Sequence, residues 1–92
     1  MIYFLVHGKG DNVAVAVVDI KKGDRCEGLN METQQRFAID AGMDIPLGHK
    51  IALQDFNEGD TIIKYDHDIG RVVRAIKKGE HVHVHNVKTK RW

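Results

Sequence analysis

The chain has 92 residues, of which 42% are hydrophobic and 29% are charged, as in an ordinary folded globular domain. This length suits one domain rather than two. The formal net charge is +1, so the chain lacks the basic excess that is typical of nucleic-acid-binding proteins. A domain of this size buries a modest core, and association with a partner chain or a homo-oligomer would be no surprise.

The single cysteine, Cys26, cannot form an internal disulfide, which favours a reducing, cytoplasmic setting. The N-terminal segment 1–7 has one short apolar run, from Ile2 to Val6, and lacks a basic lead. We therefore expect neither a secretory signal nor a membrane span.

Short apolar runs separated by turns rich in Gly, Asp and Asn predict an all-β fold. In chain order, the expected strands are 2–6, 13–18, 25–29, 34–39, 50–53, 61–65 and 69–74, and a last strand that begins at His81. The strands 25–29 and 34–39 are expected to form a hairpin, and residues 66–68 a turn. No stretch shows a sustained helical period, and the single proline, Pro46, falls in a turn.

A unit of four residues recurs along the chain. It begins with an apolar residue, continues with two variable residues and ends with glycine. Its four copies are Ile20/Gly23, Ile45/Gly48, Phe56/Gly59 and Ile76/Gly79. We expect each copy to form a tight turn whose apolar side chain fills the core and whose glycine takes a positive φ. The copies are irregularly spaced, so they do not predict a solenoid.

The segment 79–86 carries the clearest candidate chemistry, because three histidines alternate with two valines. On a strand, side chains repeat every two residues, so His81, His83 and His85 would share one face and the valines would point into the core. Imidazoles about 6.5–7 Å apart along a strand can turn toward one metal ion or one anionic ligand. A half-exposed strand with outward histidines and no site is the alternative, and the pattern alone leaves the two open.

Four blocks of the sequence carry a family resemblance. They are His7 with 11–16, then 48–53, then Gly59 with 62–65 and 69–70, and finally 79–86. In this order they resemble the N-terminal SAF (β-clip) domain of the altronate and galactarate dehydratase family. The resemblance implies a single SAF-type β-clip domain over residues 1–92, with short strands and tight glycine turns. The basic residues Lys88, Lys90 and Arg91 predict a solvated basic tail at 87–92. One departure is Asp66, where family members more often have glycine directly after the tyrosine.

In the fused dehydratases of this family, a much larger catalytic region follows the SAF domain. The resemblance therefore implies that this chain is the separately encoded small subunit of a two-chain lyase, which is the arrangement of (R)-sulfolactate sulfo-lyase. Such a lyase eliminates sulfite from (R)-sulfolactate, or water from a sugar acid such as altronate. The expected partners are a large catalytic subunit, whose active site this chain completes, and a small 2-hydroxy acid substrate.

Elimination next to a carboxylate needs a base and positive charge to stabilise the enediolate-like anion, which a divalent metal and cationic side chains supply. The resemblance implies iron, manganese or zinc on His81, His83 and His85, held by this chain or shared with the large subunit. The expected catalytic residues are His83, His85 and Lys50, and the expected substrate-binding residues are His49, Lys64, Tyr65 and Asn86.

Two other classes of protein compete with this hypothesis. A cupin-type metalloenzyme also carries His-x-His on a strand, but it needs a further Glu and a later His on a longer chain. A non-catalytic SAF binding module is the second, because fold alone gives no activity. Asp11 and Asn12 are a similar case: they form a plausible ligand pair, but after two glycines they are first of all turn residues.

Overall fold

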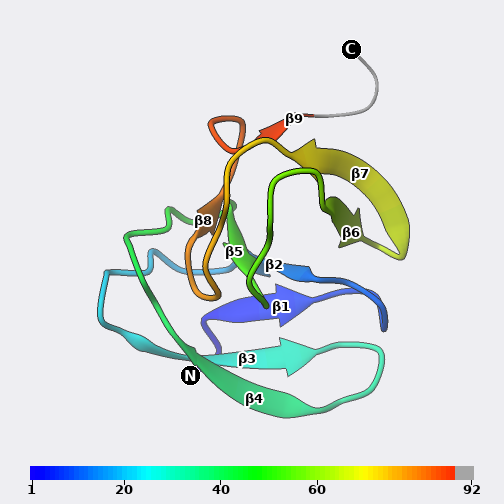
Figure 1. Ribbon diagram of the computed structural model, residues 1–92. Helices are drawn as coiled ribbons and strands as arrows, with labels where there is room; N and C mark the ends of the chain where they lie inside the picture. The colour runs from blue at the N-terminus through cyan, green and yellow to red at the C-terminus, as the bar shows by residue number, and fades with distance from the viewer. Residues whose placement is uncertain (89–92) are drawn as a thin grey trace.

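The structure is a computed structural model in which residues 1–88 are described, and over that range the chain forms short strands and no helix. The strands are β1 (Phe4–Val6), β2 (Val13–Ala16), β3 (Arg25–Asn30), β4 (Arg36–Asp40), β5 (Lys50–Ala52), β6 (Thr61–Lys64), β7 (His67–Val72), β8 (His81–Val82) and β9 (Val87–Lys88) (Figure 1). The predicted all-β class is confirmed. Within the described residues, no helix has the length and apolar character needed to cross a membrane.

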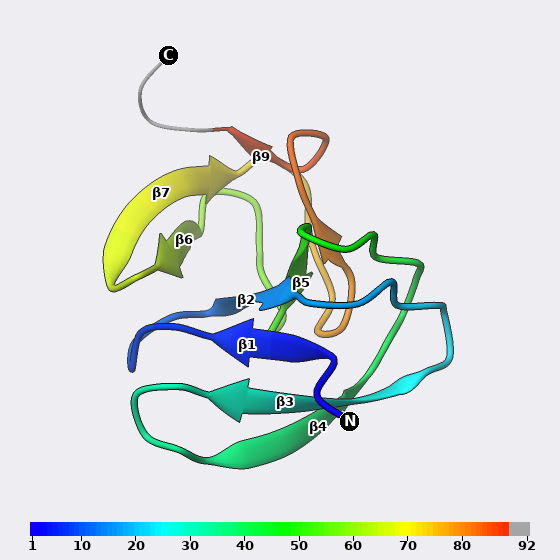
Figure 2. The same ribbon diagram turned by 180° about the vertical axis from the view of Figure 1, so that it is seen from behind.

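The strands form two sheets of unequal size (Figures 1 and 2). The larger sheet has the order β4-β3-β1-β2-β5-β8, and the smaller has the order β6-β7-β9. β1 and β3 run parallel, whereas the other paired strands are antiparallel. After β8, at the edge of the larger sheet, the chain crosses to β9 of the smaller one. The histidine segment therefore connects the two sheets.

The four apolar-x-x-Gly units form the predicted turns. Their glycines have φ between 86° and 96°, and their apolar side chains are at most 2% exposed. The turns work in pairs, because Ile20 bridges to Ile45 and Phe56 bridges to Ile76. Each bridge consists of two backbone hydrogen bonds of 2.7–3.0 Å. The paired turns thus place their apolar side chains together in the core.

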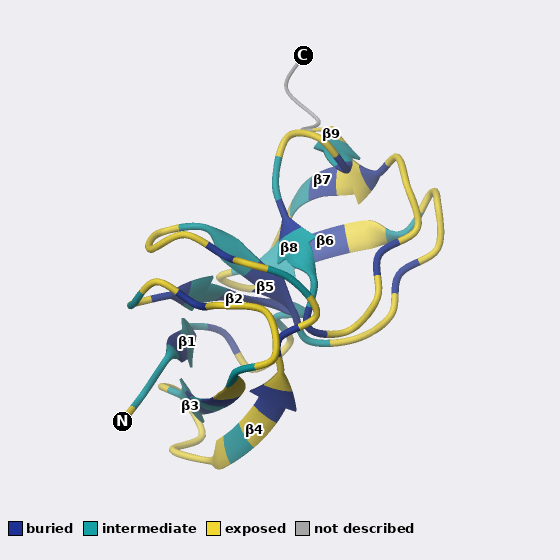
Figure 3. Ribbon diagram, turned by 90° about the vertical axis from the view of Figure 1, so that its left-hand side faces the viewer, coloured by how far each residue is buried: buried dark blue, intermediate teal, exposed yellow. Residues whose placement is uncertain are grey.

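The core has two parts, one beneath each pair of turns. The first includes Phe4, Ile20, Ile45 and Ile51, and the second includes Phe56, Ile62, Val72, Ile76 and Val82. Figure 3 shows exposed residues along the connecting turns and also on β4, β6 and β7, with buried stretches on the strands between the turns. Val82 of β8 belongs to the second part, so the start of the histidine segment is anchored in the core.

The predicted last strand is wrong beyond its first two residues. β8 ends at Val82, residues 83–86 form a turn, and Val84 is 67% exposed instead of pointing into the core. The strand ends there because Val82 pairs with Lys50, the first residue of β5, and no strand continues beyond it. His81, His83 and His85 therefore do not share one strand face.

Two smaller expectations also need correction. The turn expected at 66–68 lies at Tyr65 and Asp66, and β7 begins at His67 and ends at Val72. The expected basic tail at 87–92 begins with a strand, because β9 pairs with β7. The rest of that tail, 89–92, lies outside the described residues.

Candidate metal and substrate site

His49 and His83 face each other at the edge of the larger sheet. β5 and β8 pair antiparallel, with Lys50 opposite Val82. Continuing this register by one residue places His49 opposite His83, and their ring centroids lie 4.2 Å apart. The turn before β5 thus delivers His49 to the histidine segment.

His81 completes a cluster of three imidazoles. Nδ1 of His49 lies 2.8 Å from Nε2 of His81. The rings of His81 and His83 are nearly parallel, at 12°, with centroids 5.4 Å apart. All three side chains are partly buried, and one nitrogen from each lies within 4.8 Å of the other two. We call His49, His81 and His83 the histidine trio.

The histidine trio fits a divalent transition metal. Imidazole is a good ligand for zinc, iron and copper. Zinc–nitrogen bonds of about 2.0–2.1 Å place the ligand nitrogens of a tetrahedral ion about 3.3 Å apart, so modest rotation of the side chains is enough to share one ion. A tetrahedral ion held by three protein ligands has a fourth position for water or substrate, as in catalytic zinc sites.

Burial and nearby positive charge favour the neutral forms of His81 and His83. The pKa of His81 is lowered from 6.5 to about 4. Burial is the largest cause of this shift, and positive charge on His49, on the neighbouring histidines His83 and His85, and on Lys50 adds to it. Burial also lowers the pKa of His83, with contributions from His49, Lys50 and His85. A neutral imidazole can bind a metal or accept a proton, so His81 and His83 are ready for either at neutral pH.

The trio differs from the set predicted for the metal, in which His85 stood in place of His49. The ring of His85 is exposed and lies 5.2 Å from that of His81, and among residues 1–88 it is not part of a group that can share an ion. Because β8 ends at Val82, the two-residue alternation stops before His85. His49, which was expected to bind substrate, takes its place.

Asn86 holds the turn that carries the histidines. It is the buried polar side chain of the described range, at 6% exposure. Its Oδ1 accepts a hydrogen bond from the backbone N–H of His83 at 2.9 Å, and its Nδ2 donates to the carbonyl of His81 at 2.7 Å. The two ends of the amide thus bind the backbone of His83 and of His81, so Asn86 positions these two histidines. Its contact with substrate stays a prediction.

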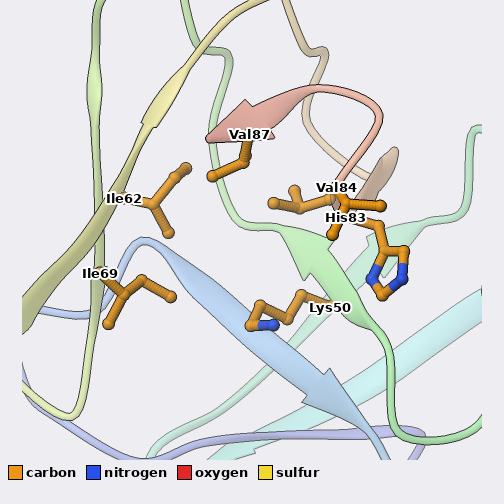
Figure 4. Close-up of a pocket in the computed structure, with 7 residues that line it drawn as sticks. Lys50, Ile62, Ile69, His83, Val84 and Val87 are labelled. Carbon is orange, nitrogen blue, oxygen red and sulfur yellow. The ribbon is translucent and has the colours of Figure 1, made fainter. Parts of the chain in front are cut away.

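Lys50 lines an apolar cavity beside the trio. Figure 4 shows its side chain in the same view as the imidazole of His83, with Ile62 and Ile69 on the far side of the cavity. Burial lowers the pKa of Lys50, and Lys64 lowers it further. Positive charge from β5 and β6 therefore gathers near the histidines.

Lys64 and Tyr65 form a second group with His7. The Nζ atom of Lys64 lies 5.2 Å from the centre of the Tyr65 ring, and the ring of His7 stacks on Tyr65 at 4.4 Å between centroids. Tyr65 is 54% exposed, so much of this residue is accessible to a ligand. Lys64 is near enough to Lys50 to affect its pKa, which connects this group with the histidine trio.

Asp11 holds Tyr65 in place, a role that sequence reasoning missed. Its carboxylate accepts backbone hydrogen bonds from Gly8 at 3.0 Å, Tyr65 at 2.9 Å and Asp66 at 2.8 Å. Burial alone would raise the pKa of Asp11. The three hydrogen bonds and the positive charge of His7 have the larger combined effect, so the pKa lies below its ordinary value. The sequence signals only the local turn at Gly8, because Tyr65 lies 54 residues away.

The turn at Tyr65 and Asp66 explains the departure from the family pattern. Their φ values are 53° and 60°, in the left-handed region that non-glycine residues adopt at a cost. Glycine after the tyrosine would avoid this cost at the second position. Here the carboxylate of Asp66 accepts a hydrogen bond from Gly10 N–H at 3.0 Å, which ties the turn to the loop after β1.

Known proteins match the chain over almost its whole length. The family model for the altronate/galactarate dehydratase SAF domain matches residues 2–90. The chain is 49% identical over 90 residues to the (2R)-sulfolactate sulfo-lyase subunit alpha of Chromohalobacter salexigens, covering 97% of this chain and 96% of that subunit. It is 44% identical over 86 residues to the altronate dehydratase of Bacillus subtilis, covering 94% of this chain and 16% of the dehydratase. The chain therefore belongs to the altronate/galactarate dehydratase SAF domain family.

Proposed function

We propose that this chain is the small subunit of a lyase that eliminates sulfite from (2R)-sulfolactate and that it completes the active site of a large catalytic subunit. The observation that carries the proposal is the histidine trio. It occurs in a chain that matches 96% of the length of a sulfo-lyase subunit alpha. Elimination of water from a sugar acid such as altronate is the second candidate, because altronate dehydratases also match the chain.

The elimination moves one proton and breaks one carbon–sulfur bond. A base removes the proton from C2, next to the carboxylate, and the C3–S bond breaks with its electron pair leaving on sulfite. The remaining enol becomes pyruvate by tautomerisation. The site must therefore supply a base, bind the carboxylate and the sulfonate, and stabilise the negative charge that develops.

The residues divide these tasks by position and charge. His85 lies beside His81 but outside the trio, and we assign it the role of the base. Lys64 supplies positive charge for the carboxylate and the sulfonate, and the hydroxyl of Tyr65, an exposed residue next to Lys64, orients the substrate. A divalent metal ion held by the trio would supply a Lewis acid for the substrate oxygens. These assignments move His83 to the metal and give Lys50 no direct part in the chemistry.

The expected setting and partner follow from the same features. The free thiol of Cys26 is buried, and a free thiol favours a reducing compartment, so we propose a cytoplasmic complex. In the larger dehydratases the matching region is a small share of one chain, which suggests that a large catalytic partner supplies the rest of the site. We expect little activity from this chain alone.

Reconstitution tests the proposal. This chain is co-expressed with the large subunit, and release of sulfite and pyruvate from (2R)-sulfolactate is measured beside dehydration of altronate. Sulfite release that depends on this chain supports the proposal, and dehydration instead supports the second candidate. The double variant His49→Ala/His81→Ala should lose turnover, whereas His67→Ala, outside the trio, should retain it. Unchanged turnover in the double variant would rule out a catalytic role for the trio.

A further inference from the structure

An apolar cavity lies between the two sheets, beside the histidine trio. Its volume is about 110 Å³, and it is lined by Lys50, Ile62, Ile69, Val82, His83, Val84 and Val87. Figure 4 shows Ile62, Ile69 and Val87 on one side and His83 and Val84 on the other, with Lys50 below them. Five of these seven side chains are aliphatic, and His83 is shared with the trio.

The lining does not suit the hydroxy acid substrate. A carboxylate, a hydroxyl and a sulfonate would each lose water against aliphatic carbon with few hydrogen-bond donors in return, which is costly. A cavity of about 150 Å³ with similar lining holds one benzene molecule, so this smaller one suits a single branched aliphatic side chain. The geometry therefore favours a hydrocarbon group over the substrate.

The lining of the cavity also carries a half-buried positive charge, that of Lys50. The ion pairs seen within residues 1–88, Arg25–Asp40 and Arg36–Glu27, do not include Lys50. Lys50 is half-buried and lies close to a second lysine, Lys64. A carboxylate arriving from outside would relieve this repulsion and would pair with Lys50 in a partly desolvated place.

An exposed valine marks the rim of the same cavity. Val84 is 67% exposed, the most of any large apolar side chain in the described range after Met1. It stands on the turn that Asn86 holds, so it is presented by an ordered part of the chain. Burial of such a residue in a complex would add apolar contact around whatever fills the cavity.

We propose that this cavity is the docking site for the large subunit, filled by one Val, Leu or Ile side chain next to an Asp or Glu that pairs with Lys50. The inference rests on the proposed function for the existence of that subunit. Because His83 belongs to both the cavity and the histidine trio, docking here brings the large subunit against the candidate metal site. The contact thus sets the two halves of the active site in register.

Binding of purified variants to the isolated large subunit tests this inference. Val84→Lys places a second positive charge at the rim and should weaken binding about tenfold or more, as for a central interface residue. Met31→Lys is the control, because Met31 is also exposed, at 47%, but lies in the turn between β3 and β4. Zinc binding by each isolated variant reports that the fold and the trio are intact.

A zero-length carbodiimide crosslink tests the proposed ion pair between Lys50 and the large subunit. It should join Lys50 to an Asp or Glu of the large subunit that neighbours an aliphatic residue, and Lys50→Met should abolish this product.

The possible outcomes separate the two proposals. Wild-type binding that Val84→Lys leaves unchanged overturns the docking site alone. Disruption of a homo-oligomer by Val84→Lys, with binding to the large subunit intact, makes a second copy the occupant and also overturns it. No binding by the wild-type chain overturns the proposed function together with this inference.

Discussion

The side-chain amide of Asn86 donates a hydrogen bond to the carbonyl of His81 at 2.7 Å, while its oxygen accepts from the N–H of His83. One buried side chain thus holds the backbone of two members of the trio. In metal sites, groups that orient the ligands contribute to affinity without touching the ion. Asn86 orients His81 and His83 in this way.

Replacement of Asn86 by alanine should therefore affect both stability and metal binding. Without the amide, a backbone N–H and a carbonyl lose their partners, and the free energy of unfolding should fall by about 1–3 kcal/mol. Zinc affinity should fall by about 10–100-fold, as for other residues that orient ligands. Urea unfolding in a chelator and calorimetric titration with zinc measure the two effects.

Asn30→Ala is the matched control for this prediction. Oδ1 of Asn30 also accepts backbone hydrogen bonds, from Glu32 and Thr33, but in a solvent-exposed hairpin turn. Water can replace these bonds, so the stability loss should be smaller and zinc affinity should not change. Equal zinc affinity in Asn86→Ala and wild type would contradict the positioning role.

A second prediction distinguishes the trio from the set expected from the sequence. In the isolated chain, His49→Ala should lower zinc affinity by about 100-fold or more, because loss of a ligand exceeds the effect of an orienting group. His85→Ala should leave it nearly unchanged, because the ring of His85 lies beside His81 and outside the trio. Titrations of both variants decide the question, and the reverse order of effects would restore His85 as the ligand.

Much of the fold could be predicted because its signals are local. A turn such as Ile45–Gly48 depends on an apolar residue and a glycine that takes positive φ, and both lie within four consecutive positions. Strands between such turns follow from β-branched residues and alternation. For the same reason Val82, next to the Gly79 turn, was correctly expected in the core.

The composition of the site could not be predicted, because it depends on the register between distant strands. His49 joins His83 only through the pairing of Lys50 with Val82, and no local pattern contains that information. The end of β8 depends on the length of its partner strand in the same way. Alternation alone therefore suggested His85, and the hydrogen bonds of Asn86 show why the chain turns before it.

A third prediction concerns Asp11, whose carboxylate binds the left-handed turn at Tyr65 and Asp66. Asp11→Ala should lower the free energy of unfolding by about 2 kcal/mol, because charge-assisted hydrogen bonds to the strained turn are lost. Turnover should fall as well if Tyr65 orients the substrate. Asp60→Ala is the control, since that carboxylate accepts a backbone bond from Asn57 at an exposed glycine turn. An equal or larger loss in the control would refute the special role of Asp11.

A last prediction is an acid-sensitive fold in the metal-free chain. Burial holds the pKa of His81 near 4, below its ordinary 6.5, so between these values the unfolded chain binds more protons than the folded one. Stability should therefore be complete above pH 6.5 and fall as the pH drops toward 4, and the lowered pKa of His83 acts in the same direction.

The urea midpoint, measured in a chelator from pH 7.5 to 4.5, should show this slope in the wild type and a flatter one in His81→Gln. His67→Gln removes a histidine outside the trio and should keep the wild-type slope. If His81→Gln kept it too, the acid sensitivity would come from other groups.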